Sequence, residues 1–267
     1  MKFKRIIALL ADLHVGCRYA VFPEDFVSEE GNNLSATMND MQVKLLEYFK
    51  HYVQVCNDLN VDSVFLVGDL IAGTNPSEQG RLMVTTNLNE QKEACIKLLE
   101  PLCKGRKVGV WSGTRYHDSL TYRTEQDIAR HFKGKFFGEI ANVRLVPSNR
   151  VASISHHGHS AIIYPETAFG RDMTFYLESM ALGKLPKIDI IIRAHLHRWC
   201  YIHRYKIHYV SLPCFQGFVP YPRAVKYFGK LQPDIGGAIL FIDEEDRIRV
   251  WHYLYPNISV TSNIVEG

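Results

Sequence analysis

The chain has 267 residues, of which 46% are hydrophobic and 22% are charged. These values are close to the averages of globular domains and exclude a disordered or fibrous chain. The formal net charge of +3 is too small to indicate a nucleic acid partner by itself. The six cysteines are irregularly spaced and form no Cys-x-x-Cys pair, so they indicate neither a disulfide framework nor a thiolate zinc site.

The length suits one α/β domain over residues 1–267, with a flap or substrate loop expected at about residues 211–237. The apolar run after Arg5 is interrupted by Asp12, and no small-residue cleavage site follows, so it predicts a strand rather than a signal peptide. No stretch approaches the ~20 apolar residues that a membrane-spanning helix needs. We therefore expect a cytoplasmic protein that does not enter membranes.

The first half of the chain predicts alternating strands and helices. Apolar runs typical of buried parallel strands lie at residues 6–10, 61–67 and 107–111. Helical spacing predicts helices at residues 40–60, 89–103 and 120–132, the first of them beginning at a capping box in Thr37–Asp40. Glycine, proline and asparagine predict loops at residues 15–39 and 71–86. This alternation is typical of a parallel sheet with right-handed crossovers.

The second half predicts a second, more antiparallel sheet, because short strands separated by turns prevail there. The expected short strands lie at residues 143–146, 151–155, 160–164, 201–203, 207–210, 238–242 and 248–254. An apolar strand is also expected at residues 188–192, and one helix near residues 172–182.

Carboxylates and imidazoles directly follow four of the apolar strands. The strand at 6–10 precedes Asp12 and His14, and the later strands precede Asp69, His117, His195 and His197. Ligands gather beyond the carboxyl ends of strands in open α/β sheets, so these side chains are expected at one rim. Asp69 is our candidate for a carboxylate that bridges two metal ions.

A mixed set of imidazoles and carboxylates suits Mn, Fe or Zn better than Mg or Ca. Each pair alone is weak evidence, because an aspartate after a strand is more often a cap and a single histidine is more often an ordinary hydrogen-bonded residue. Their joint placement at strand ends favours a metal centre. Because alternate residues of a strand face the same side, His195 and His197 can reach adjacent ions.

Five motifs in this order resemble the signature of the calcineurin-like metallophosphoesterase superfamily across residues 12–197. They are Asp12-Leu13-His14, Gly68-Asp69, the loop Gly113–Asp118, His156-His157-Gly158-His159, and Ala194-His195-Leu196-His197. The resemblance implies a four-layer α/β/β/α sandwich, in which two mixed β-sheets are flanked by helices. It also implies two divalent transition-metal ions at the sheet edge.

The resemblance assigns a role to each ligand in turn. It implies one metal held by Asp12, His14 and His197, a bridge at Asp69, and a second metal held by His157 and His195. The resemblance favours His157 over His156 because family members commonly place this ligand immediately before glycine.

Two positions depart from the family pattern. Ala194 replaces a glycine, which is tolerated where φ is not positive. Thr114 replaces a metal-binding asparagine, and two extra residues precede the histidine of that motif. Thr114 is therefore an uncertain metal ligand. The place of the asparagine ligand can be taken by the Thr114 hydroxyl, by His117 or by water.

Hydrolysis of a phosphoester is the chemistry that needs this set, because two metals lower the pKa of a shared water to give the attacking hydroxide and neutralise phosphoryl charge. His117 is the candidate to protonate the leaving oxygen or steady the phosphoryl oxygens. Arg115, two residues earlier, is a candidate to bind a phosphate oxygen, and a solvated surface arginine is the simpler alternative.

Basic and aromatic residues in the C-terminal part favour phosphodiester or nucleic acid substrates, although an ordinary solvated face is the simpler interpretation. The first cluster is Arg198, Tyr201, Arg204, Tyr205 and Lys206, and the second is Arg223, Lys226, Tyr227 and Lys230. Two alternatives stay open: a phosphomonoesterase acting on phosphoprotein or a metabolite, and a weakly catalytic metal-binding scaffold. The sequence indicates no oligomeric state.

Overall fold

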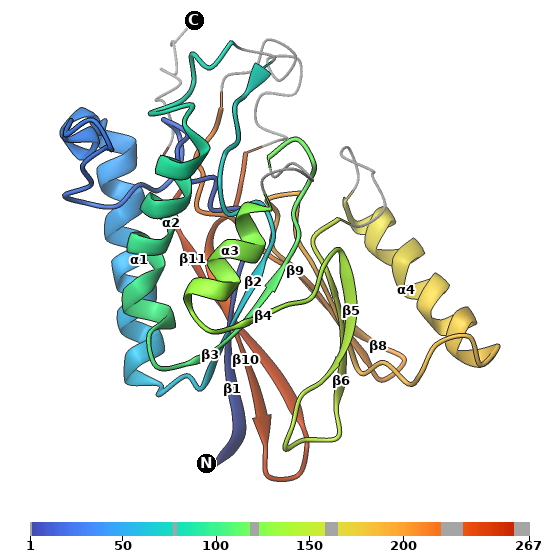
Figure 1. Ribbon diagram of the computed structural model, residues 1–267. Coiled ribbons are helices and arrows are strands. Elements are labelled where there is room, and N and C mark those ends of the chain that lie inside the picture. Colours follow the sequence, from blue (N-terminus) through green and yellow to red (C-terminus); the bar gives the residue numbers. More distant parts are fainter. Residues whose placement is uncertain (1, 77–78, 118–122, 158–164, 220–231, 259–267) are drawn as a thin grey trace, which may run out of the picture.

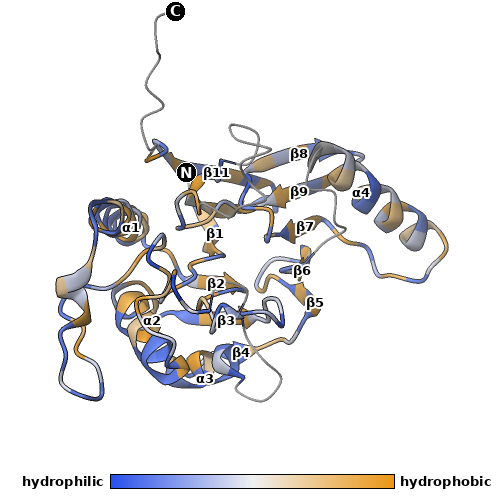
Figure 2. Cartoon of the chain, turned by 90° about the horizontal axis from the view of Figure 1, so that it is seen from above, coloured by the Kyte–Doolittle hydropathy of each residue, from blue (hydrophilic) through white to orange (hydrophobic). Residues whose placement is uncertain are grey.

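The structure is a computed structural model that describes residues 2–76, 79–117, 123–157, 165–219 and 232–258. Two mixed β-sheets lie against each other, with helices on both outer faces (Figures 1 and 2). The first sheet is covered by α1 (Asp40–Asp58), α2 (Leu88–Cys103) and α3 (Thr124–His131), and the second by α4 (Pro165–Ala181). The expected four-layer α/β/β/α sandwich is therefore confirmed.

The first sheet has the strand order β11-β10-β1-β2-β3-β4. Its strands are β1 (Phe3–Leu10), β2 (Ser63–Val67), β3 (Lys107–Trp111), β4 (Lys135–Phe136), β10 (Ile235–Asp243) and β11 (Ile248–Tyr255). β1 to β4 are parallel, whereas β10 runs antiparallel to both β1 and β11. The last two strands were expected in the second sheet. They belong to the first because β10 is buried along its whole length, as a central strand covered on both faces must be.

The second sheet has the order β5-β6-β7-β9-β8. Its strands are β5 (Ile140–Arg144), β6 (Val151–Ser155), β7 (Ile190–Arg193), β8 (Cys200–Arg204) and β9 (Ile207–Ser211). The three inner strands are parallel and the two edge strands antiparallel, so the sheet is mixed rather than mostly antiparallel. The strand expected at residues 160–164 lies outside the described residues, as does the 220–231 part of the expected flap.

Three apolar layers hold these elements together. Along β1, Ala8 and Leu10 pack under the helices, whereas Ile7 and Leu9 face the second sheet, as alternation along a strand requires. The layer between the sheets also contains Trp111. A third layer joins α4 to the second sheet. The carboxyl ends of the parallel strands of both sheets are thereby fixed relative to one another.

Two helix boundaries differ from expectation. α1 begins after a capping box formed by Asn39 and Gln42, in which each side chain accepts from the other's backbone N–H, so the box lies two residues beyond Thr37. α4 begins at Pro165 rather than near residue 172, since proline is favoured in the first helical turn. Within the described residues, no helix is long and apolar enough to cross a membrane.

Candidate metal centre

Five strands deliver polar side chains to one edge of the sandwich. β1 leads to Asp12 and His14, β2 to Asp69 and β3 to Thr114. From the second sheet, β6 leads to His156 and β7 to the pair His195 and His197. The carboxyl ends of parallel strands meet at one edge, so residues far apart in sequence converge here, as the sequence predicted.

The backbone at this edge is unusual, because five non-glycine residues have left-handed φ values. They are Asp12 (51°), His14 (45°), Asp69 (49°), His195 (73°) and His197 (52°). Such conformations are uncommon outside glycine and cluster at functional sites. Ala194 does not have a positive φ, so its methyl group replaces the family glycine without backbone strain.

Asp12 is fully buried and lies among three imidazoles. Its Oδ1 is 2.9 Å from Nε2 of His156, 3.3 Å from Nε2 of His197 and 3.6 Å from Nε2 of His14. Its Oδ2 accepts a hydrogen bond of 2.9 Å from the backbone N–H of His195. The Nε2 atoms of His14 and His197 are themselves 3.1 Å apart. Imidazole nitrogens and a carboxylate oxygen, which converge here, are donor types that divalent transition metals accept.

Asp69 is the second buried carboxylate, and the loop after β3 fixes its orientation. Its Oδ1 accepts from the backbone N–H of Thr114 at 2.6 Å and from the Thr114 hydroxyl at 3.1 Å. Its Oδ2 is 3.5 Å from Nε2 of His156 and 3.9 Å from Nε2 of His117. The hydroxyl of Thr114 is thus a hydrogen-bond donor to Asp69. Thr114 thus fixes the orientation of the Asp69 carboxylate.

His117 lies at the same edge with a defined tautomer. Its Nδ1 is 2.6 Å from the carbonyl oxygen of Ala72, and a carbonyl oxygen can only accept, so the proton is on Nδ1. In the neutral ring, Nε2 then carries a lone pair directed toward Asp69 and His14. A metal-binding histidine almost always donates its other ring N–H in this way.

These residues form three overlapping groups whose ligand atoms lie within 4.8 Å of one another. The groups are Asp12, His14 and His197; His14, Asp69 and His117; and Asp69, His156 and His195. His14 and Asp69 each belong to two groups. The donor atoms are oxygens and nitrogens without thiolate, which fits divalent Mn, Fe or Zn.

The structure places His156, rather than the preferred His157, in this cluster. His156 is buried, whereas His157 is exposed and its ring packs against that of His195, with centroids 4.7 Å apart. The reason is strand alternation: Ala152 and Ile154 face the layer between the sheets, and His156 continues that face. The cluster therefore differs from the preference for His157, and the apolar alternation that places His156 there was a signal available in the sequence. His159 lies outside the described residues.

The charges of the cluster balance one another. Burial disfavours a charged Asp12, yet His156 and His197 hold the pKa of Asp12 well below its ordinary value. Burial lowers the pKa of His156, and the stronger combined effect of Asp12 and Asp69 raises it to about 9. Burial and the neighbouring His117 lower the pKa of His14 to about 4. The two carboxylates therefore stabilise positive charge at His156, whereas burial and His117 disfavour positive charge at His14.

Two glycines and a third buried carboxylate shape the surroundings of Asp69 and His156. A Cβ atom at Gly113 would overlap Asp69, and one at Gly68 would overlap the ring of His156. Glu125, at the start of α3, is fully buried and accepts from the backbone N–H of Gly113 at 2.7 Å. The sequence analysis missed Glu125 because it lies far from any motif. Only the fold brings it beneath the loop.

Arg115 differs from the other predicted site residues. Its side chain is 73% exposed, and its guanidinium lies 3.8 Å from the carboxylate of Glu139. It belongs to none of the three ligand groups. Arg115 therefore lies at the rim, where its charge is partly balanced by Glu139.

No protein-family profile matches the sequence of this chain, and no curated protein sequence matches it. Its structure is similar to that of an archaeal phosphodiesterase, with 14% identity, a TM-score of 0.46 and coverage of 93% of this chain and 99% of the other. It is also similar to a zinc complex of Vps29 from Entamoeba histolytica, with 14% identity, a TM-score of 0.42 and coverage of 93% and 98%. A predicted phosphoesterase from Streptococcus pneumoniae shows 13% identity, a TM-score of 0.37 and coverage of 96% and 100%.

The fold and the edge cluster define the chain as a four-layer α/β protein with a candidate metal centre. In the order of its motifs and in its layers, it resembles the calcineurin-like metallophosphoesterases.

Proposed function

We propose that the chain is a metal-dependent phosphoesterase and that phosphodiesters are its substrates. The observation that carries this proposal is the overlap of three ligand groups through His14 and Asp69. Adjacent sites that share a carboxylate are what two-metal hydrolysis of a phosphoester requires.

In this proposal, Asp12, His14 and His197 would hold one divalent cation, His156 and His195 would hold the other, and Asp69 would serve both. The bound cations would supply Lewis-acid chemistry by lowering the pKa of water and offsetting phosphoryl charge. The chain itself orients both carboxylates. Thr114 fixes Asp69, and the backbone N–H of His195 fixes Asp12.

We assign His117 as a ligand, in place of the expected general acid. An acid needs its proton on the nitrogen that faces the substrate. In the neutral ring the proton is on Nδ1, bonded to Ala72, and Nε2 offers a lone pair to the group formed with His14 and Asp69. Thr114 is hydrogen-bonded to Asp69 and supplies no ligand, and His117 would take its place as a ligand.

The proposal is tested by a manganese-supplemented assay that compares a bis-aryl phosphodiester with an aryl phosphomonoester, with and without chelator. We expect faster hydrolysis of the diester and loss of activity with the chelator. Asp69→Ala should be the most damaging single substitution, because it affects both cation sites. Faster hydrolysis of the monoester would favour the phosphomonoesterase alternative. Two bound metals without hydrolysis of either ester would favour the scaffold alternative.

Adjacent histidines provide a matched pair of variants. We expect His156→Gln to lower metal affinity or activity by roughly 10–100-fold, the usual effect of disturbing a ligand shell. His157→Gln, one residue further and exposed, should leave both unchanged. The reverse result would restore His157 as the ligand. Thermal unfolding of both variants shows whether a loss at His156 is merely a folding defect.

A further inference from the structure

Arg193 is a buried cation at the end of β7, directly before the metal centre. The side chain is 4% exposed, and it lies on the face of the strand that meets α4, because Ile191, two residues earlier, packs in the layer under that helix. Arg193 belongs to none of the three ligand groups. A buried guanidinium needs partners for its charge and its donors, so its contacts indicate which elements it joins.

The contacts of Arg193 join three elements. From α4, the carboxylate of Asp172 lies 2.9 Å from Nε, and the hydroxyl of Tyr176 accepts a hydrogen bond of 2.8 Å from a terminal nitrogen. From β6, the carbonyl oxygen of Ser153 accepts one of 3.3 Å. The hydroxyls of Tyr176 and Ser153 are themselves 2.7 Å apart. The guanidinium therefore fixes α4, β6 and its own strand relative to one another.

The two strands joined in this way lead to the two imidazoles proposed for the second cation. His156 follows Ser153 by three residues, and His195 follows Arg193 by two. The backbone N–H of Ala194 donates to the carbonyl oxygen of His156 at 3.1 Å, so the strand ends stay joined beyond the guanidinium. A displacement of either strand end would therefore change the separation of the two ligand rings.

A small cavity lies between Arg193 and the metal centre. Arg193 and His195 both line it, and Phe169 of α4 and Tyr209 of β9 close it. Its volume is about 10 Å³, which leaves room for one water molecule at most. Closely packed interiors transmit displacements instead of absorbing them. A change at Arg193 should therefore reach His195.

The segment that follows Arg193 needs support from outside. His195 and His197 have left-handed φ values of 73° and 52°. Non-glycine residues adopt such conformations at a cost in free energy and keep them only where the surrounding contacts determine them. In this conformation the backbone N–H of His195 donates to Oδ2 of Asp12 at 2.9 Å. Arg193 supplies a fixed anchor directly before this segment.

Stability alone does not explain a buried ion pair in this place. Removing two charges from water often costs more than their attraction returns, and apolar side chains of similar size can stabilise a fold equally well or better. The planar guanidinium has five donors in fixed directions, which apolar side chains lack. The pair of Arg193 and Asp172 therefore contributes geometry that an apolar pair would not.

We propose that Arg193, together with Asp172, is a positioning residue that orients His156 and His195 for the second cation. This inference rests on the proposed function and identifies residues that act on the metal site through its ligands. The pair is neutral as a whole, so removing both charges leaves the net charge of the chain unchanged. A change in metal affinity would then report the geometry of the strand ends.

The double variant Arg193→Met/Asp172→Leu tests the inference by calorimetric titration with manganese, beside thermal unfolding in chelator. We expect it to unfold at or above the wild-type temperature, because an apolar pair replaces the ions. One of the two binding steps should weaken by roughly 10–100-fold, the usual effect of losing a group that orients ligands. A merely structural role would lower the unfolding temperature and leave the metal affinity of the folded protein unchanged, which would overturn the inference.

A single variant keeps the test decisive if the double variant does not fold. Arg193→Lys retains the charge beside Asp172 but loses the planar fork that reaches Tyr176 and Ser153. The same binding step should weaken by about tenfold, the lower end of that range. Wild-type affinity in folded Arg193→Lys protein would contradict the positioning role.

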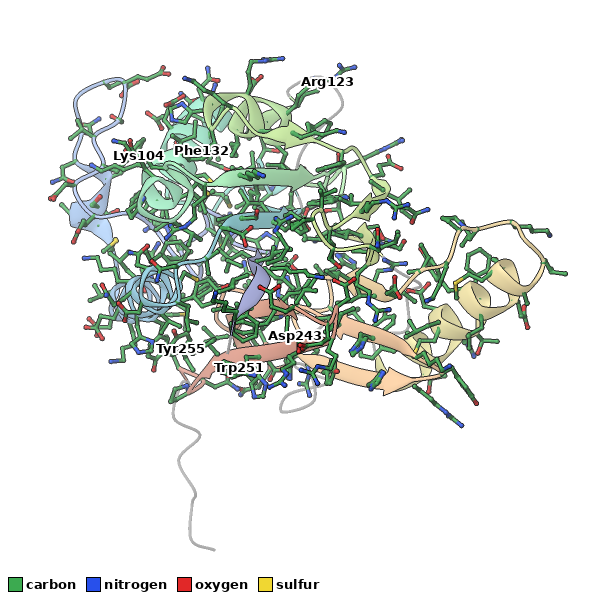
Figure 3. All side chains as sticks on the ribbon, turned by 90° about the horizontal axis from the view of Figure 1, so that it is seen from below. Lys104, Arg123, Phe132, Asp243, Trp251 and Tyr255 are labelled. Atoms are coloured by element: carbon green, nitrogen blue, oxygen red, sulfur yellow. The ribbon has the colours of Figure 1, made fainter. Side chains whose placement is uncertain are left out.

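The opposite end of the same strands provides a matched control. Arg150 and the buried Asp189 form an ion pair of 2.7 Å directly before β6 and β7. Nε of Arg150 donates to the carbonyl oxygen of Asp246 between β10 and β11, close in sequence to Asp243, which is labelled at this edge in Figure 3. Arg150→Met/Asp189→Leu should leave both binding steps unchanged. Equal losses of metal affinity in the two double variants would overturn the inference.

Failure of the inference and failure of the proposed function give different results. If the wild type hydrolyses the bis-aryl diester and Arg193→Met/Asp172→Leu binds metal as the wild type does, only the inference fails. If that variant loses affinity in one binding step while the wild type hydrolyses no ester, the proposed function fails and the positioning role stands.

Discussion

Replacing His117 with alanine separates its two possible roles. Nε2 of His117 lies 3.9 Å from Oδ2 of Asp69, and Nδ1 is engaged with Ala72. If His117 is a ligand, its removal should weaken metal binding to the group formed by His14, Asp69 and His117 by roughly 10–100-fold. Since each tenfold change corresponds to about 1.4 kcal/mol, the loss in binding free energy is about 1.4–2.8 kcal/mol.

Calorimetric titration with manganese, beside activity measured across the same metal concentrations, distinguishes the two roles. For a ligand, His117→Ala should shift one binding step and recover most activity at saturating metal. For a general acid, metal binding would be unchanged, and turnover would fall by about 10²–10⁴-fold at every metal concentration. That second pattern would refute the ligand assignment. Arg115→Ala, two residues away and exposed, is the control and should alter neither binding step.

Two further predictions concern a glycine and a histidine. Gly113→Ala should reduce metal binding sharply in a calorimetric titration, because the added Cβ would overlap Asp69, whereas Gly170→Ala, which meets open space, should bind metal normally. Equal metal binding by both variants would contradict this packing. Burial, followed by His203 and Arg150, lowers the pKa of His208 from 6.5 to about 4. As the pH falls, the unfolded chain therefore protonates His208 before the folded chain does, so the free energy of unfolding should decline between pH 6.5 and about 4. The decline should be less steep in His208→Gln. Equal slopes of unfolding free energy against pH in the two proteins, measured by denaturant titration, would refute this prediction.

The strand ends that carry the site were predictable from the sequence. Apolar runs before Asp12, Asp69 and His195 are long enough to identify buried strands, and parallel strands must end at a common edge. The layered fold followed from the resemblance. The position of β10 beside β1 could not be predicted in this way. These strands are more than 200 residues apart in the sequence, and their pairing depends on which strands compete for the same sheet edge.

The local details of the site were harder to predict. The choice of His156 over His157 depends on which face of β6 meets the other sheet, and the family pattern outweighed the apolar alternation that indicated it. The role of Thr114 depends on the path of the loop after β3, which brings its hydroxyl to Asp69. Glu125 supports that loop from α3, and its contribution is visible only when the helix is in place.

In the proposed centre, Asp69 serves two divalent cations. Anomalous X-ray diffraction from a crystal soaked in manganese tests it most directly. We expect two peaks about 3.5–4 Å apart, the separation of two-metal sites, one beside Asp12, His14 and His197 and the other beside His156 and His195. A single peak, no peak at this edge, or a second peak held by His157 would contradict it.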